Sequence, residues 1–193
     1  MEKFTMAPFK ANIDFKSILD KYKTLKARNR AFKSLTSEGK RLEIAWDALQ
    51  LILLGMIRGS NGSYWNYHLM NRVWKIKTSE ELHKSLNDLS TFKTDDYRSC
   101  EVCQRGALML SQIRLGNTLS PKSSDIACGN DKNIKGFTLE QFRVMEDEYE
   151  YSLYSHPYHC NSDEKMANIL CNVLVNGEFD TEDKTDYLIH DKK

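Results

Sequence analysis

Apolar residues recur every three or four positions in several parts of this chain, the spacing that places them on one face of a helix. One such stripe predicts a helix over residues 12–25 whose opposite face is rich in lysine. A stronger stripe runs from Leu42 to Met56, includes Trp46, and predicts the main core helix. Between them, residues 26–35 (KARNRAFKSL) are interpreted as a basic connector.

Turn and capping residues divide the rest of the chain. Gly59 and the pair Asn61-Gly62 precede SYWNY, a pattern that predicts a short β-hairpin. Thr78 with Glu81 forms a capping box, which predicts that a helix begins there.

A second capping box pairs Thr138 with Gln141, and Phe137 and Phe142 stand at the spacing of a hydrophobic staple. We therefore expect another helix to begin at this point.

The last helix is expected to begin at a Ser162 cap and to carry an apolar stripe from Met166 to Leu174. Asn176-Gly177 supplies its stop. An acidic tail follows, with Tyr187, Leu188 and Ile189 as the residues expected to hold it to the fold.

These elements predict a mainly α fold of about five or six helices with one small β-hairpin, in a single domain over residues 1–193. Residues 117–136 are rich in Ser, Asn, Gly and Lys, and are expected to form a mobile surface loop or a binding loop. Residues 178–193 form the acidic tail.

The net charge of +1 conceals a strong gradient along the chain. Residues 1–41 hold eleven Lys or Arg against four acids, whereas residues 138–193 hold thirteen acids against five bases. We expect the two ends to lie near one another and partly neutralise, although each could instead serve a partner of the opposite charge.

Composition narrows the class of protein. Apolar residues make up 40% of the 193 residues and charged residues 28%, which is ordinary for a soluble protein. No apolar run approaches the roughly 18 residues that span a bilayer, and the first ten residues lack the apolar core of a signal peptide. The expected location is the cytoplasm, where the five cysteines would remain thiols.

The segment RSCEVCQRGALMLSQIRLGN carries two cysteines at C-x-x-C spacing. Zinc would need a second pair of ligands, and the candidate set is Cys100, Cys103, His156 and His159, whose halves lie more than fifty residues apart. A redox pair is also conceivable but would normally follow a strand in a βαβ unit. The favoured interpretation is close packing, because Cys103, Gly106 and Ala107 form a strip of small residues. We therefore expect no bound metal and no cofactor.

Aromatic side chains gather in the predicted hairpin, where Tyr64, Trp65 and Tyr67 follow the turn. Aromatic residues near a turn either pack in the core or form part of a protein interface. We keep these three residues as the candidate partner-binding site. No nucleophile elbow, phosphate loop, metalloprotease motif or dinucleotide fingerprint occurs, so we expect no enzymatic activity and assign no catalytic residue.

Three segments, RLEIAWDALQLILLGMIRGSNGSYW, CEVCQRGALMLSQIRLGN and SDEKMANILCNVLVNGEFD, resemble a loose family of small bacteriophage and bacterial proteins with a C-x-x-C-x-x-G-A helix. They cover about a third of the chain. The family carries no assigned catalytic residues and no matching histidine pair, which argues against zinc. The lysine-rich N-terminus is also similar in style to early proteins of T4-like phages, some of which bind and block a host defence factor.

The resemblance implies a non-enzymatic phage-type protein that inhibits a host factor by stoichiometric binding, of the anti-defence or anti-toxin class, in the host cytoplasm. The alternative is a nucleic-acid-associated accessory protein, stabilised by zinc at the four ligands above. Its phosphate contacts would be Lys16, Lys21, Lys23, Lys26, Arg28, Arg30 and Lys33. Binding to nucleic acid is expected to be weak and non-specific, because no DNA-binding motif is present, and no membrane partner is expected.

Overall fold

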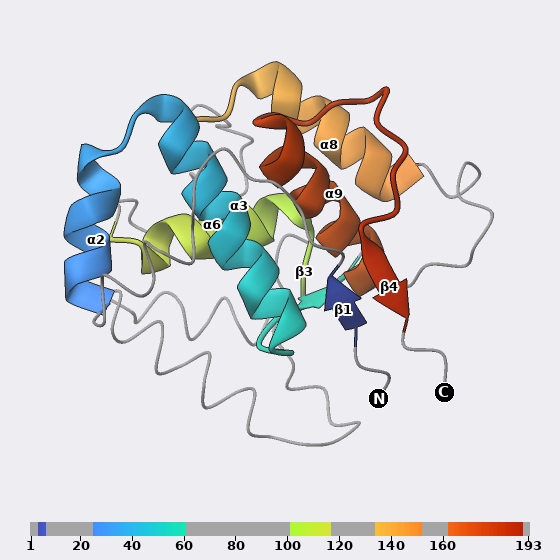
Figure 1. The fold of residues 1–193 in the computed structure, drawn as a ribbon, viewed down its shortest axis with the longest axis horizontal. Coiled ribbons are helices and arrows are strands. Elements are labelled where there is room, and N and C mark those ends of the chain that lie inside the picture. The colour runs from blue at the N-terminus through green and yellow to red at the C-terminus, as the bar shows by residue number, and fades with distance from the viewer. Residues whose placement is uncertain (1–3, 7–24, 61–100, 117–133, 152–161, 191–193) are drawn as a thin grey trace.

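The computed structural model describes residues 4–6, 25–60, 101–116, 134–151 and 162–190 (Figure 1). These residues form a mainly α fold, as the sequence predicts. The helices of this part of the chain are α2 (Leu25–Ser34), α3 (Ser37–Leu53), α6 (Gln104–Arg114), α8 (Leu139–Tyr151) and α9 (Ser162–Asn176). The predicted helices over residues 12–25 and after Thr78 lie outside the described residues, except that Leu25 begins α2.

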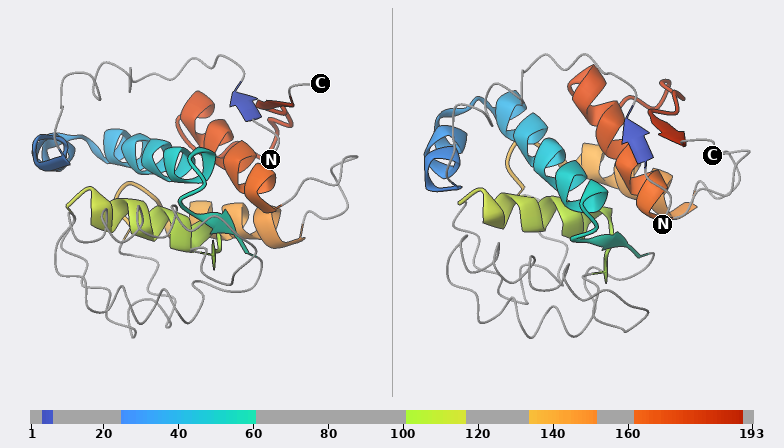
Figure 2. Two further views of the ribbon diagram at one scale, coloured as in Figure 1. Left: turned by 90° about the horizontal axis from the view of Figure 1, so that it is seen from below. Right: turned by 60° about the horizontal axis from the view of Figure 1, so that its bottom comes forward.

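The four longest helices pack in two layers around one apolar core. α3 and α9 form one layer, and α6 and α8 form the other (Figure 2). The core contains side chains from every layer, among them Leu49, Leu108, Met145 and Leu170, each fully buried. Burial of these stripes is the main stabilising term, since each large apolar side chain removed from water contributes about 1.5–3 kcal/mol.

α3 lies where its apolar stripe predicts. The Thr36 hydroxyl caps its first turn by accepting a hydrogen bond from the Gly39 amide at 3.1 Å. Leu42 and Leu49 are fully buried, while Trp46 is only partly buried against the core. The helix also buries two carboxylates, Glu43 and Asp47, which the stripe alone does not predict.

The interpretation of residues 26–35 as a connector is wrong, since α2 occupies most of them. The segment consists largely of Lys, Arg and Ala, which have high helix propensity even without an apolar stripe. Phe32 and Arg28, four residues apart on one face, are both buried. α2 therefore packs on the molecule through the ring of Phe32 and the ion-paired Arg28, and not through an apolar stripe.

The predicted start of α8 is confirmed in detail. The Thr138 amide donates to Gln141 Oε1 at 3.0 Å, and the Gln141 amide donates to Thr138 Oγ1 at 3.2 Å. The rings of Phe137 and Phe142 pack 5.1 Å apart between centroids, as a hydrophobic staple requires. Local side-chain chemistry therefore determines where this helix begins.

α9 begins at Ser162 and ends at Asn176, and Gly177 follows with a left-handed φ of +83°. This confirms the predicted stop, because a glycine adopts that conformation without steric cost.

After α9 the chain turns back as a segment we call the strap, residues 177–188. The Asn172 side-chain amide donates to the carbonyls of Asp180 and Asp183 at 2.9 and 3.1 Å, and its oxygen accepts from the Asp180 amide at 2.8 Å. Tyr187 and Leu188 are buried, as predicted for the acidic tail. The acidic tail is therefore bound along α9 from its beginning.

Two small sheets join segments that are distant in the sequence. β1 (Phe4–Met6) pairs antiparallel with β4 (Leu188–His190), and β2 (Arg58–Gly59) pairs parallel with β3 (Glu101–Val102). The first pairing confirms that the two ends of the chain lie side by side (Figure 1). The predicted β-hairpin after Gly59 lies outside the described residues.

The predicted loop over residues 117–136 is fixed to the core at its end. Ile134 is buried, and the Lys135 amide donates to Gln112 Oε1 at 2.5 Å. Gly136 lies so close to α3 that a Cβ there would meet the Ser37 carbonyl oxygen at 2.2 Å. Arg41 closes this contact by donating to the Gly136 carbonyl at 2.9 Å.

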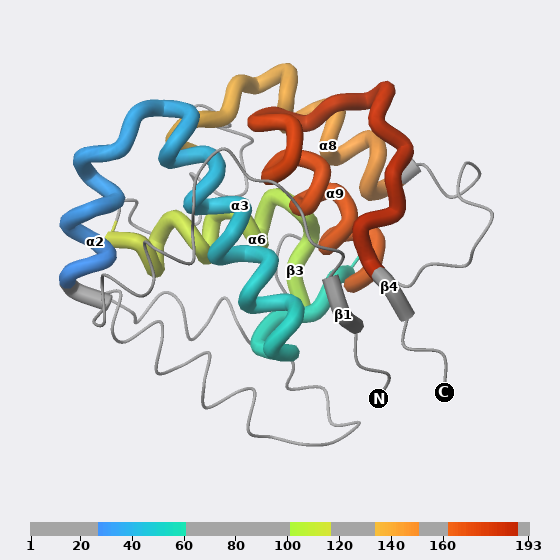
Figure 3. Tube along the Cα trace, in the orientation of Figure 1, coloured from blue at the N-terminus to red at the C-terminus, as the bar shows by residue number. Residues whose placement is uncertain are grey.

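Within the described residues, no helix is long and apolar enough to cross a membrane. The tube in Figure 3 follows the chain through α2, α3, α6, α8 and α9 in order.

Candidate functional site

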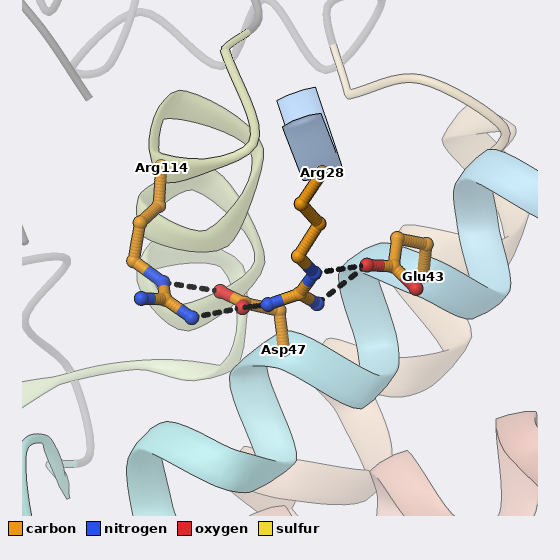
Figure 4. Close-up of polar contacts among 4 residues, drawn as sticks. All are labelled: Arg28, Glu43, Asp47 and Arg114. Atoms are coloured by element: carbon orange, nitrogen blue, oxygen red, sulfur yellow. Dashed lines mark hydrogen bonds and ion pairs between the residues drawn. The ribbon is translucent and has the colours of Figure 1, made fainter. Parts of the chain in front are cut away.

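Four charged side chains from three helices meet inside the molecule, and we call Arg28, Glu43, Asp47 and Arg114 the charged quartet (Figure 4). Arg28 of α2 donates through Nε to Glu43 Oε1 at 2.5 Å and through Nη1 to Asp47 Oδ1 at 2.7 Å. Arg114, at the end of α6, donates through Nε to Asp47 Oδ2 at 2.8 Å and through Nη2 to Asp47 Oδ1. The quartet therefore connects α2 and α6 to α3.

The pKa values of the two carboxylates are shifted in opposite directions. Burial alone would raise the pKa of Asp47, but Arg114 and Arg28 together outweigh it and hold the pKa below its ordinary value. Burial also raises the pKa of Glu43, and here Arg28 offsets the rise only in part. In their ordinary ionised forms the two arginines and the two carboxylates of the quartet balance one another, as buried charges require.

The thiol of Cys103 lies at the N-cap of α6 with an extended backbone, and the residue is 4% exposed. Burial raises its pKa to about 11, so the group is a protonated thiol near neutral pH. Gly106 and Ala107 are buried on the following turn. This burial agrees with the packing interpretation of the C-x-x-C segment.

The zinc alternative concerns residues of which the structure describes only one. Cys100, His156 and His159 lie outside the described residues. Within the described part of the chain, no group of three or more His, Cys, Asp or Glu side chains could hold a metal ion. The described residues therefore offer no support for the alternative metal site.

A junction of α8, α9 and β2 was not predicted from the sequence. The Asp163 carboxylate accepts a hydrogen bond from the Gly59 amide, and Tyr149 is fully buried beside it. A Cβ at Gly59 would lie 2.6 Å from the Ser162 carbonyl oxygen and 2.9 Å from the Tyr149 hydroxyl. Burial raises the pKa of Tyr149 far above its ordinary value, so the phenol stays protonated. The junction is therefore a packing contact, because the space requires a glycine and the phenol has no charge at neutral pH.

The basic residues proposed for phosphate contact differ in their exposure to solvent. Arg28 is 7% exposed and ion-paired with Glu43 and Asp47, so its assignment to phosphate binding is corrected. Arg30 and Lys33 are exposed on α2. Lys26 belongs to α2, but its side chain lies outside the described residues, as do Lys21, Lys23 and the earlier Lys16.

The predicted partner-binding residues Tyr64, Trp65 and Tyr67 also lie outside the described residues. Shortly before them in the sequence, Leu54 at the end of α3 is 67% exposed. A single exposed leucine is common on protein surfaces and does not by itself define an interface.

α8 and the strap, which lie side by side, are both rich in acidic residues. The strap runs alongside α8, because Gln141 Nε2 donates to Glu178 Oε2 at 2.9 Å and Lys184 lies 3.9 Å from Glu148. Together α8 and the strap carry ten acidic side chains and two basic ones. We call the exposed acids of these two elements the acidic face: Glu140, Asp147, Glu178, Asp180, Glu182 and Asp186.

All the residues of the acidic face belong to residues 138–193, which the sequence identifies as the acidic end of the chain. The sequence does not show that α8 and the strap lie side by side, since Gln141 and Glu178, which join them, are 37 residues apart. Comparison with known proteins adds no further assignment: no protein-family model matches this chain, and neither a curated protein nor a solved structure shows significant similarity to it.

Proposed function

We propose that this protein is a non-enzymatic binding protein that captures a partner protein stoichiometrically, and that the partner presents a basic surface to the acidic face. The observation that carries the proposal is the alignment of the strap with α8, which collects same-sign charges from two separate segments. Such a surface attracts a basic partner over several ångströms and speeds its association.

The interior supports binding rather than catalysis. The buried thiols of Cys103 and Cys171 have pKa values raised by burial to about 11 and about 12. The quartet neutralises its own charges, and Tyr149 is protonated. These groups are suited to holding the fold, whereas the exposed charges of the acidic face are accessible to other molecules.

The resemblance to phage and bacterial proteins suggests the setting. On that basis we propose that the partner is a host factor in the bacterial cytoplasm, and that binding inhibits it as an anti-defence or anti-toxin protein would. The hairpin residues Tyr64, Trp65 and Tyr67 remain the proposed apolar part of the interface.

The test is partner capture by the tagged full-length chain from bacterial lysate, followed by affinity measurement with the purified partner. The triple variant Glu140→Gln/Asp147→Asn/Glu182→Gln removes three exposed charges from the acidic face. Because exposed charges contribute about 0.2–1 kcal/mol each, we expect affinity to fall roughly tenfold at low salt. Added salt should weaken the wild-type complex more than the variant complex.

The matched control is Arg30→Gln/Lys33→Gln, which removes exposed charges of the opposite sign from α2. It should leave capture unchanged. Equal affinity of wild type and triple variant at low salt would reject the acidic face as the interface. If Trp65→Ala abolishes capture while the triple variant binds as tightly as the wild type, the hairpin and not the acidic face is the binding surface.

A further inference from the structure

The charged quartet attaches α2 to α3, and through Asp47 to α6. The helix lies at one end of the molecule, beside the start of α3 and the end of α6 (Figure 1). Phe32 supplies its buried apolar contact, and Asn29 lies against Gly116, where a Cβ would meet Asn29 Cβ at 2.9 Å. Arg28 is the side chain through which α2 reaches the buried carboxylates.

The two carboxylates are satisfied to different degrees. Both oxygens of Asp47 accept hydrogen bonds from guanidinium groups. In Glu43 both Arg28 contacts go to Oε1, while Oε2 is buried without a hydrogen-bond partner. A buried charged oxygen without a donor is costly. A proton on Glu43 Oε2 would remove that cost and still leave Oε1 free to accept from Arg28.

We infer that Glu43 is a protonation-dependent control on the docking of α2: the helix is held most tightly when Glu43 is protonated and Asp47 is ionised, and is released more readily when both are charged. Among the described residues, the charged groups that act on Glu43 are Arg28 from α2, Asp47 from its own helix and Arg114 from α6.

The direction of the effect follows from linkage. With α2 docked, Glu43 is only 1% exposed, and burial raises its pKa although Arg28 of α2 opposes the rise. Because the net shift in the docked state is upward, docking takes up a proton and is favoured as the pH falls toward the ordinary value of 4.5. This contribution is lost as the pH rises through the raised pKa of the docked state. For Asp47 the docked pKa is lowered, so its contribution is present above 3.8 and is lost only at stronger acidity. α2 is therefore most firmly docked at mildly acidic pH.

Hydrogen exchange of the α2 amides, corrected for the intrinsic pH dependence of exchange, measures this docking directly. In the full-length wild type, protection of α2 should increase severalfold from neutral to mildly acidic pH, since each unit of pKa difference between docked and released states is worth a factor of about ten. Glu43→Gln mimics the protonated side chain. It should hold α2 at the acid-level protection at both pH values.

The matched control Glu182→Gln, on the strap, should retain the wild-type pH response. Protection of α2 that does not change with pH in the wild type, or that changes equally in Glu43→Gln, would overturn the inference. Should Glu43→Gln fail to fold, a carbon-13 titration of the Glu43 carboxyl in the wild type decides the matter. A titration midpoint at or below 4.5 contradicts the proposal, and one above it supports it.

Discussion

A buried charge is stable only while its counter-charge remains in place, and in this protein Asp47 is the residue to which that rule applies most strictly. Its side chain is fully buried and accepts hydrogen bonds from two arginines on two other helices. Its partners are also nearly inaccessible to water, with side chains only 8% and 9% exposed. Losing the carboxylate would therefore leave two desolvated guanidinium groups without compensation.

Asp47→Asn keeps the shape of the side chain and removes its charge. We expect it to lower the free energy of unfolding by about 3–5 kcal/mol at neutral pH, as removal of one member of a buried ion pair typically does. Urea denaturation measures the loss. The difference from wild type should begin to shrink only below pH 3.8, where the unfolded chain takes up a proton on Asp47, and should go on shrinking until the pH reaches the lowered pKa of the folded state.

Asp147→Asn makes the same chemical change at an exposed position of α8. It should change stability by no more than about 0.5 kcal/mol. A comparable loss in both variants would show that the charged quartet has no special role.

The reactivity of the Cys103 and Cys171 thiols tests whether these two sulfur atoms are buried. Both thiols are buried, and burial raises their pKa values to about 11 and about 12, so the reactive thiolate is scarce at neutral pH. Iodoacetamide at neutral pH should leave both residues unmodified in the folded protein and modify them quickly in denaturant, as peptide mass spectrometry will show. Rapid modification of Cys103 without denaturant would contradict the packing interpretation.

At the scale of single elements, local signals in the sequence are sufficient to predict some helices and insufficient for others. Thr138 and Gln141 determine the start of α8 because both partners of the hydrogen bonds lie within one turn. α2 lacks the apolar stripe by which the other helices are recognised. Its residues have high helix propensity, but the contact of Arg28 with Asp47 on the next helix is one that no short-range pattern contains. The charged quartet and the acidic face depend in the same way on packing between distant segments.

Two glycines with similar backbone angles differ in the space around them and make a matched pair. Gly55 has φ +68° and open space where a Cβ would lie, with no atom within 4 Å, whereas Gly136 has φ +87° and lies against the backbone of α3. Gly55→Ala should cost about 1–2 kcal/mol, the left-handed penalty alone.

Gly136→Ala carries the same penalty and also forces its chain away from Ser37 and Arg41. We expect a clearly larger loss of thermal stability, with the excess reporting how rigidly residues 134–136 are held to α3. Equal losses in the two variants would mean that this contact yields easily.

At the scale of the whole molecule, the acidic end of the chain is held in place mainly by backbone and amide hydrogen bonds and not by its charges. β1 and β4 bring the basic and acidic ends together through backbone hydrogen bonds. The strap is held by amide side chains of α9, chiefly Asn172 and Asn168. Its carboxylates are thus left largely at the surface, where they form the acidic face with α8.

Asn172→Ala removes three hydrogen bonds between α9 and the strap at a residue that is 4% exposed. We expect a loss of about 1–3 kcal/mol and faster cleavage after Glu178 and Glu182 by a glutamate-specific protease. Asn176→Ala, at an exposed position with one contact to Asp183, should cleave at nearly the wild-type rate. Equal cleavage of the Asn172 variant and the wild type would show that the strap is held by other contacts.

The pairing of β1 with β4 also determines how the molecule would respond to mechanical load. Phe4 is opposite His190 and Met6 is opposite Leu188, so the chain enters β1 and leaves β4 at the same end of the ladder. Force applied between the two termini would peel the ladder open one hydrogen bond at a time instead of shearing all of them together. In an optical trap this sheet should part at low force, as a first and separate step, before the helices of the core yield.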